Sequence, residues 1–487
     1  MLQKHVQIIL GPPGTGKTST CLKIVEDALG RGVPPEKIAY LAFTRKAAYE
    51  AQERAMEQFK FEQGRLPYFR TLHSLAFKML ELRRDEMMTP SHYRKLGKIL
   101  GIQFRGVFDE DLGLHLGDGL GDKCSRVADL ARITLRGIEE EHHRLNLPDL
   151  TIHAVKQYAE ALKIYKDENG LYDFTDLLEN YNHPLDIEIA IFDEAQDLSS
   201  LQYKVAFKVA ERAQEVYVAG DDDQAIFSWA GASKKFLELK GDQIILPQSF
   251  RIPRAVHRLA IDVVKRIKHR YVKPWNPRID EGKVEYVASE QEIEFNDSES
   301  WMLLARSKYL LSRLKQAVRQ QGFGYTYNGK NSLDNEMTRA IVSWESLRNG
   351  KNLGRHEAKN LLPFLGVKIK LKSQESYGIE DFGLPKEILL QDWMTVLKSI
   401  PSEEREYLRS CLRNNQKFHV DPKIVISTIH QSKGGEADNV VLLTDMGRRS
   451  WESLGEDEEN RVWYVALTRT RETLYLVQPR GLRYFEI

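Results

Sequence analysis

Short apolar runs alternate along the chain with polar turns and with longer stretches of helical periodicity. Four runs lie in the first half and three near the end: residues 6–10, 38–43, 187–192 and 216–219, then 424–427, 440–444 and 474–477. They hold four to six mostly β-branched or apolar residues without strict alternation, which favours strands covered on both faces, as in a parallel sheet. Helical stretches between several of these runs predict the α/β class.

Two regions lack this alternation of apolar runs and turns, and their sequence predicts mainly helix. The clearest predicted helices cover residues 72–82, 152–167, 337–347 and 403–412. A stretch rich in proline, glycine and acidic residues, 269–300, predicts a linker. The result is two α/β cores, each interrupted by a mainly helical insertion. The predicted boundaries are 1–77 and 171–250 for the first core, 78–170 for its insertion, 251–330 and 415–487 for the second core, and 331–414 for its insertion.

Composition narrows the class of protein. Of 487 residues, 42% are hydrophobic and 29% charged, which fits a soluble globular protein with several cores. No apolar run is long enough for a membrane helix, and the start of the chain has no signal-peptide pattern, so we expect no membrane association. The three cysteines are too far apart for a CxxC metal site, which favours the cytoplasm.

The charge balance is near zero. The chain carries 71 Lys and Arg against 70 Asp and Glu, a formal net charge of +1. Taken alone, this sum argues against a nucleic-acid binder, but the distribution of charge decides such binding rather than its total.

A glycine-rich segment, GPPGTGKT at residues 11–18, follows the first apolar run and opens a helical stretch. In a P-loop the glycines let successive backbone N–H groups point at phosphate oxygens, and the helix N-terminus adds its dipole. Lys17 is expected to neutralise the phosphates of ATP, and the Thr18 hydroxyl is expected to bind Mg²⁺. The predicted nucleotide-binding residues of this segment are Gly11, Pro12, Gly14, Thr15, Gly16, Lys17 and Thr18.

Two further motifs follow predicted strands. Asp193 and Glu194 come directly after residues 187–192, and adjacent carboxylates there can divide two tasks. We expect Asp193 to hold Mg²⁺ and Glu194 to act as general base on the attacking water. Gln224 follows three consecutive aspartates at 221–223 and could bond the γ-phosphate or the water. Three consecutive aspartates are typical of a solvated loop, and we expect this of two of them.

Additional motifs complete a resemblance. They are AFTRKAA at 42–48, TLHSL at 71–75, GDDDQAIFSW at 220–229, QSFR at 248–251, STIHQSKGGE at 427–436 and YVALTRTR at 464–471. In this order and approximate spacing the chain resembles the superfamily-one DNA helicases of the UvrD/Rep/PcrA type. The resemblance covers both cores and implies that each is a RecA-like motor domain.

The resemblance implies further roles at the nucleotide. Arg251 and Arg469 would come from the second core and act as arginine fingers, which are worth about 10³–10⁵ in rate. Phe250 stands where the family has a tyrosine that stacks on adenine, and Glu436 resembles the residue that meets the ribose. Because only ten residues precede Gly11, the family's adenine-reading segment is absent or replaced, and use of other nucleoside triphosphates is open.

The resemblance also implies a path for single-stranded DNA. Motors of this kind hold phosphates and stack bases on aromatic side chains. The expected DNA residues are Phe43, Thr44, Arg45, His73, Trp229, Thr428 and His430. Trp229 follows Gln224 closely, which offers a short connection between the γ-phosphate and the grip on DNA. Ala230 stands where the family has an arginine, so one charge near the DNA is missing.

These features predict an ATP- and Mg²⁺-dependent DNA helicase that translocates on single-stranded DNA, with 3′→5′ polarity implied by the family. The expected partners are single-stranded DNA and junctions of single- and double-stranded DNA, with an accessory loading protein left open and a monomer as the active form. One alternative is a translocase that strips proteins from DNA without efficient unwinding. A DNA-binding scaffold without hydrolysis is a further alternative, which the joint set of catalytic residues disfavours.

Overall fold

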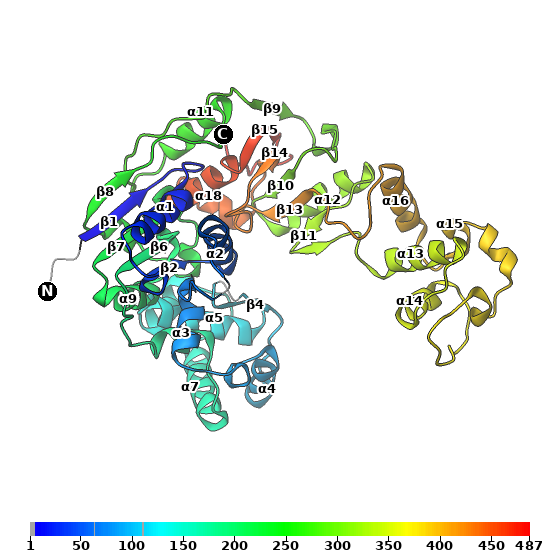
Figure 1. The fold of residues 1–487 in the computed structure, drawn as a ribbon, viewed down its shortest axis with the longest axis horizontal. Helices are drawn as coiled ribbons and strands as arrows, with labels where there is room; N and C mark the ends of the chain where they lie inside the picture. The colour runs from blue at the N-terminus through cyan, green and yellow to red at the C-terminus, as the bar shows by residue number, and fades with distance from the viewer. Residues whose placement is uncertain (1–4, 63, 110–111) are drawn as a thin grey trace. The chain divides into compact units, whose positions relative to one another are not determined.

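The computed structural model describes residues 5–62, 64–109 and 112–487, which form two compact units (Figure 1). Unit 1 comprises Met1–Arg254, Ile261–Asp280 and Gly455–Tyr464, and unit 2 comprises Ala255–Ala260, Glu281–Leu454 and Val465–Ile487. Residues 261–280 and 455–464 therefore pack with the first sheet, although the sequence boundaries place them in the second core. The finer division into cores and insertions stays a prediction.

Unit 1 is built on a six-stranded sheet with the order β3-β2-β6-β7-β1-β8, and every pairing in it is parallel. The strands are β1 (His5–Leu10), β2 (Ile38–Ala42), β3 (Phe69–Thr71), β6 (Ile189–Asp193), β7 (Glu215–Gly220) and β8 (Asp242–Ile245). In the register, Leu10 lies beside Gly220 and Ala42 beside Asp193. The loops that follow these strands therefore meet at one edge of the sheet.

Both faces of this sheet are covered, as the continuous apolar runs predict. On one face, α1 (Lys17–Gly30) and α2 (Arg45–Phe59) pack against Ile9, Tyr40 and Ile191. On the other, α3 (Leu72–Met79), α8 (Phe174–Glu179) and α9 (Ser200–Val209) pack against Ile8 and Leu41. Successive strand residues thus enter opposite cores, and a doubly covered parallel sheet results.

The first insertion is mainly helical, as predicted. Its helices are α4 (Pro90–Leu100), α5 (Leu120–Thr134), α6 (Ile138–Leu145) and α7 (Ile152–Asn169). A short hairpin, β4 (Val107–Asp109) and β5 (Leu114–Leu116), interrupts them. The helices share a core of their own around Leu96, Val127 and Tyr158.

Unit 2 is built on a seven-stranded sheet with the order β12-β11-β13-β10-β14-β15-β9, in which only the β11–β12 pairing is antiparallel among those described. The strands are β9 (Lys283–Val287), β10 (Trp301–Ala305), β11 (Thr326–Tyr327), β12 (Lys330–Asn331), β13 (Ile424–Thr428), β14 (Ala437–Leu443) and β15 (Thr470–Val477). Helix α12 (Leu311–Gln320) packs against it.

The second insertion carries α13 (Glu336–Arg348), α14 (Arg355–Leu361), α15 (Trp393–Val396) and α16 (Ser402–Arg413), connected by long irregular segments. Trp344, Phe382 and Leu408 belong to its separate core. The remaining helices are α10 (Lys235–Glu238), α11 (Arg254–Val264), α17 (Arg448–Glu452) and α18 (Asp457–Leu467).

All seven predicted strands and all four predicted helices are confirmed, apart from small shifts at their ends. The linker predicted at 269–300 is wrong, because it contains strand β9 and the fully buried side chain of Lys273. β9 is an edge strand whose five residues are all exposed or half-buried, and its sequence lacks the continuous apolar run of a central strand. Among the described residues, no helix has the length and apolar character required to span a bilayer.

Candidate functional site

The glycine-rich segment connects the buried strand β1 to helix α1. Gly14 and Gly16 adopt positive φ angles of 74° and 80°, which glycine accepts without strain. A Cβ atom at Gly11 would lie 2.5 Å from Cγ of Lys17, so the loop closes around this side chain. Lys17 Nζ donates to the Gly11 carbonyl at 2.8 Å. This cradle at the N-terminus of a 14-residue helix fits an anionic phosphate group.

Asp193 ends strand β6 next to this loop and is 3% exposed. Its Oδ2 accepts a hydrogen bond from Thr18 Oγ1 at 3.2 Å, and its Oδ1 accepts one from the Glu194 backbone N–H at 2.9 Å. Burial, followed by the charge of Glu194, raises the pKa of Asp193. A carboxylate and a hydroxyl held this close are hard oxygen donors of the kind that fit Mg²⁺.

Glu194 lies in the left-handed region, with φ 53° and ψ 38°. A non-glycine residue there costs on the order of 1–3 kcal/mol and is common at functional sites. Its Oε2 accepts a hydrogen bond from Gln196 Nε2 at 2.6 Å, while Gln196 Oε1 accepts one from the Asp221 backbone N–H at 3.0 Å. Gln196 therefore connects Glu194 with the loop after β7, a role that the sequence motif did not reveal.

The three aspartates after β7 are buried, so the prediction of a solvated loop is wrong. Asp221, Asp222 and Asp223 are at most 2% exposed, and each contacts the ammonium group of Lys273. The Lys273 Nζ atom lies 3.0, 2.6 and 2.8 Å from their carboxylates, and its side chain has no exposed surface. Gln224 Nε2 donates to Asp221 Oδ2 at 2.8 Å, so this cluster also holds Gln224.

Two arginines complete the charge balance of this aspartate cluster. Arg270 donates to both carboxylate oxygens of Asp223 at 2.7 and 2.6 Å. Arg461 Nε donates to the backbone carbonyl of Asp222 at 2.8 Å. Although burial alone would raise it, the Lys273 charge holds the pKa of Asp221 below its usual value. For Asp222, burial prevails and raises the pKa to about 6.

The QSFR motif lies against the glycine-rich loop in unit 1. The Phe250 backbone N–H donates to the Gly14 carbonyl at 2.8 Å, and Ser249 Oγ donates to the Pro13 carbonyl at 2.9 Å. A Cβ atom at Gly14 would lie 2.4 Å from Cβ of Arg251, so Arg251 directly adjoins the loop. The resemblance implied Arg251 on the second core, whereas these bonds place it in unit 1. The Phe250 side chain is 74% exposed beside the loop.

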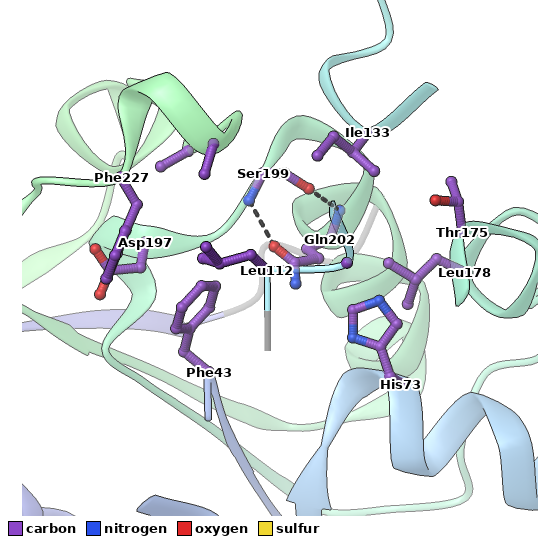
Figure 2. Close-up of a pocket in the computed structure, with 13 residues that line it drawn as sticks. Phe43, His73, Leu112, Ile133, Thr175, Leu178, Asp197, Ser199, Gln202 and Phe227 are labelled. Carbon is purple, nitrogen blue, oxygen red and sulfur yellow. Dashed lines mark hydrogen bonds between the residues drawn. The ribbon is translucent and has the colours of Figure 1, made fainter. Parts of the chain in front are cut away.

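Aromatic side chains follow the carboxyl ends of β2 and β7. The rings of Phe43 and Phe227 stack with centroids 5.9 Å apart, and Trp229 lies 6.4 Å beyond Phe227. Phe43, Phe227 and His73 line one pocket, shown in Figure 2, whose polar wall includes Ser199. We call Phe43, Phe227 and Trp229 the aromatic surface; Phe43 is 9% exposed, and the other two are half-buried. The sequence interpretation did not assign Phe227.

The side chains of His73 and Arg45 both contact the ring of Phe174. Phe174 lies 4.6 Å from the His73 ring and 5.9 Å from the guanidinium carbon of Arg45. Burial, together with the charge of Arg45, lowers the pKa of His73 to about 4, so its ring is neutral at pH 7. Thr44 Oγ1 accepts a hydrogen bond from the Ala47 N–H at 3.2 Å and caps helix α2.

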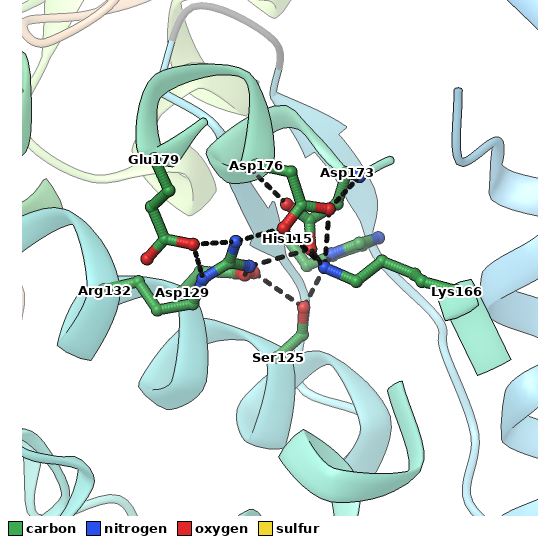
Figure 3. Close-up of polar contacts among 8 residues, drawn as sticks. All are labelled: His115, Ser125, Asp129, Arg132, Lys166, Asp173, Asp176 and Glu179. Carbon is green, nitrogen blue, oxygen red and sulfur yellow. Dashed lines mark hydrogen bonds and ion pairs between the residues drawn. The ribbon is translucent and has the colours of Figure 1, made fainter. Parts of the chain in front are cut away.

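An ion network connects α5 and α7 of the first insertion with α8, which begins at Phe174; Figure 3 shows the residues of the network. Asp173, which caps α8 and precedes Phe174, contacts Lys166 of α7 at 2.5 Å and Arg132 of α5 at 2.7 Å. Although burial alone would raise it, these two cations lower the pKa of Asp173 to about 2. Burial and the charge of Asp173 raise the pKa of Asp129 to about 7. The network thus ties α5 and α7 of the insertion to α8, whose Phe174 ring supports His73.

The remaining predicted residues belong to unit 2. Thr428 ends β13, and its Oγ1 lies 3.2 Å from Gln431 Oε1. Burial, followed by the charge of Arg306, lowers the pKa of nearby His430 to about 3. Glu436 forms an ion pair with Arg471.

Arg469 is 2% exposed, and its guanidinium donates to the Val465 carbonyl at 2.9 Å and to the Gly435 carbonyl at 3.0 Å. Backbone carbonyl groups of unit 2 therefore fix the position of the Arg469 guanidinium. The structure therefore groups the predicted residues into two sets. Unit 1 brings the glycine-rich loop, Asp193, Glu194, Gln224, Arg251, Phe250 and the aromatic surface to one sheet edge, and unit 2 carries the other set.

Two family models match this chain. The UvrD/REP helicase N-terminal domain matches residues 2–244, and the UvrD-like helicase C-terminal domain matches residues 423–477. Together they cover more than half of the chain and include both sets of site residues except Phe250 and Arg251.

Curated proteins with names of DNA helicases are similar to this chain. YjcD of Bacillus subtilis, named as an ATP-dependent DNA helicase, is 22% identical over 98% of this chain and 77% of its own length. The ATP-dependent DNA helicase Rep of Buchnera aphidicola is 22% identical over 74% of this chain and 55% of its own length. The ATP-dependent DNA helicase PcrA of Bacillus subtilis is 24% identical over 74% of this chain and 50% of its own length. The chain thus spans about half the length of Rep and PcrA.

Proposed function

Because this chain belongs to the UvrD/REP helicase family, we propose that it is an ATP- and Mg²⁺-dependent motor that moves 3′→5′ on single-stranded DNA and unwinds duplex. One observation carries the proposal. The glycine-rich loop, Asp193, Glu194, Gln224 and the aromatic surface of Phe43 and Trp229 all follow strands of one parallel sheet and share its carboxyl edge. A nucleotide site and a base-stacking surface on the same edge are what a DNA-driven ATPase needs.

The nucleotide chemistry follows from the side chains at this edge. Lys17 and the first turn of α1 would hold the phosphates, and Thr18 with Asp193 would hold Mg²⁺, which neutralises charge on the phosphates. Glu194 would take a proton from the attacking water, and Gln224 would orient that water. The hydrogen bond from Gln196 fixes the Glu194 carboxylate for this task.

A short covalent path connects this chemistry with DNA. Gln224 and Trp229 are five residues apart, and Phe227 between them stacks on Phe43. The ion pairs of Lys273 with Asp221, Asp222 and Asp223 anchor the start of this segment. A displacement of Gln224 by the γ-phosphate would therefore be passed to the aromatic surface that we propose for DNA. The hydrogen-bonded path from Glu194 through Gln196 to Asp221 reaches the same segment.

The roles that the resemblance gives to unit 2 stay part of this proposal. They are charge stabilisation at the phosphates by Arg469, recognition of the ribose by Glu436, and DNA binding by Thr428 and His430. Since the pKa of His430 is about 3, this histidine would contact DNA as a neutral ring. Arg251 would act on the phosphates from unit 1.

The proposal predicts ATP hydrolysis that depends on single-stranded DNA, and unwinding of a duplex with a 3′ tail but not one with a 5′ tail. ATPase and strand-displacement assays on the two tailed substrates test motor activity, substrate and polarity together. Unwinding from the 5′ tail alone would overturn the polarity. ATPase without unwinding, combined with release of streptavidin from biotinylated DNA, would establish the protein-stripping translocase instead. No DNA-stimulated ATPase on any substrate would overturn the motor itself.

Trp229→Ala is expected to weaken single-stranded DNA binding about 5- to 150-fold, because a stacked base contributes about 1–3 kcal/mol. Basal ATPase should change little, and the DNA concentration that half-activates ATPase should rise. Trp451→Ala, which removes a 43% exposed tryptophan of unit 2 without a proposed role, is the control. An equal loss of basal and DNA-stimulated turnover in Trp229→Ala would show that this ring is structural.

A further inference from the structure

Tyr40 places a hydroxyl group directly on the carboxylate of Asp193. It lies in the middle of β2, is fully buried, and belongs to the core beneath helices α1 and α2. Its ring stacks on Phe69 with centroids 5.3 Å apart and an interplanar angle of 21°. The packing therefore fixes the direction of the hydroxyl, whose oxygen lies 2.6 Å from Asp193 Oδ2.

The Asp193 carboxylate is held from both sides. Oδ1 accepts the backbone N–H of Glu194 at 2.9 Å, and Oδ2 accepts the hydroxyls of Tyr40 at 2.6 Å and Thr18 at 3.2 Å. The shorter of the two hydroxyl contacts comes from Tyr40, which has no exposed surface and lies in the core beneath α1 and α2. The Tyr40 hydroxyl is the donor of its contact, since an ionised carboxylate can only accept.

A hydrogen bond of this kind has two effects on a metal-binding carboxylate. It fixes the direction of the carboxylate plane, and it stabilises the negative charge in a buried place. Thr18 Oγ1 contacts the same oxygen and is itself a proposed Mg²⁺ ligand, so this hydroxyl is required for two tasks. Tyr40 can keep Asp193 Oδ2 oriented while Thr18 serves the metal.

We propose that Tyr40 is a positioning residue for Mg²⁺, which holds the Asp193 carboxylate in the orientation that the metal–nucleotide complex requires. This inference rests on the proposed nucleotide site and adds a residue to it. Tyr40 contacts neither nucleotide nor metal and acts only through Asp193. Loss of an outer hydrogen bond to a metal ligand typically lowers metal affinity about 10- to 100-fold.

The test is the Mg²⁺ dependence of nucleotide binding, measured by calorimetry with a non-hydrolysable ATP analogue. Tyr40→Phe keeps the ring and its stacking on Phe69 and removes only the hydroxyl. The Mg²⁺ concentration at half-maximal enhancement of binding should rise at least about tenfold, while the affinity in EDTA should match the wild type. A purely structural role would instead lower the affinity equally with and without Mg²⁺.

Tyr217→Phe is the matched control. Its hydroxyl also donates to a carboxylate at 2.6 Å, but the acceptor is Glu215 Oε2 at the opposite end of the same sheet. This variant should retain the wild-type Mg²⁺ dependence. A second variant separates orientation from folding: in an Asp193→Asn background, adding Tyr40→Phe should cause no further rise in the Mg²⁺ requirement.

Two failures are distinguishable. A wild-type protein that binds the analogue with no Mg²⁺ enhancement would contradict the proposed nucleotide site, and the role of Tyr40 would fall with it. If Mg²⁺ clearly enhances binding to the wild type, and Tyr40→Phe needs the same Mg²⁺ concentration for half-maximal enhancement, the role of Tyr40 alone is overturned. A further rise in the Asp193→Asn background would also overturn it, because Tyr40 would then act by another route.

Discussion

Glu194→Gln should reduce DNA-stimulated ATP hydrolysis by about 10²- to 10⁴-fold, the usual contribution of a general base. The substitution preserves the size of the side chain and removes the negative charge that would accept a proton from water. Glu194 already accepts a 2.6 Å hydrogen bond from Gln196, so its orientation is set by the protein. Nucleotide binding should persist, because the phosphates are assigned to the glycine-rich loop and Lys17. Single-turnover hydrolysis at saturating DNA, with analogue binding measured in parallel, gives both values.

The control for this substitution lies just outside the other end of β6. Glu188→Gln makes the identical chemical change just before the first residue of β6, at the end of the sheet opposite Glu194. It should leave turnover within about twofold of the wild type, as expected for a surface change away from the site. A Glu194→Gln variant that binds the analogue and hydrolyses ATP within tenfold of the wild type would remove Glu194 from the role of general base.

Local motifs explain which parts of this site could be predicted from the sequence. The glycine-rich loop, Asp193 and Glu194 each follow an apolar run directly. A segment of about ten residues therefore predicts the strand, the turn after it and the side chains that bind the nucleotide. Parallel strands then place these turns at a common edge without any knowledge of the strand order. The order itself, with β1 between β7 and β8, is not encoded in any single segment.

The residues that the sequence interpretation missed are linked to the site by tertiary contacts. Tyr40 reads as an ordinary core residue of β2, and only the pairing of β2 with β6 brings its hydroxyl to Asp193. Lys273 lies in a stretch rich in proline that reads as a linker. Buried aspartates after a buried strand require a cation nearby, but nothing in the sequence says which lysine or arginine supplies it.

Arg251 shows the limit of an argument from resemblance. Its motif can be read from the sequence, but the unit to which it belongs differs from the one that the resemblance implied. The hydrogen bonds of Ser249 and Phe250 to the glycine-rich loop decide that assignment, and they become visible only in three dimensions. Roles that depend on which unit supplies a charge therefore need structural information even where the motif is clear.

Lys273→Met should lower the free energy of unfolding of unit 1 by about 3–5 kcal/mol at pH 8, the usual cost of removing one partner from a buried ion pair. The ammonium contacts Asp221, Asp222 and Asp223 within 3.0 Å and has no exposed surface. Methionine fills much of the same volume, so the loss reports mainly the uncompensated carboxylates. DNA-stimulated ATPase should fall as well, because Asp221 holds Gln224. Urea unfolding followed by circular dichroism measures the stability.

The pH dependence separates this electrostatic cause from a packing defect. The pKa of Asp222 is about 6 even beside Lys273, and removal of the cation should raise the pKa of the aspartates further. The folded variant then binds more protons than the unfolded chain, so its stability falls as pH rises. The deficit relative to the wild type should therefore be smaller at pH 5.5 than at pH 8, and Asp222→Asn added to Lys273→Met should recover part of it. Lys265→Met, which removes an exposed lysine of the same unit, should cost less than about 0.5 kcal/mol. A deficit independent of pH would assign the role of Lys273 to packing.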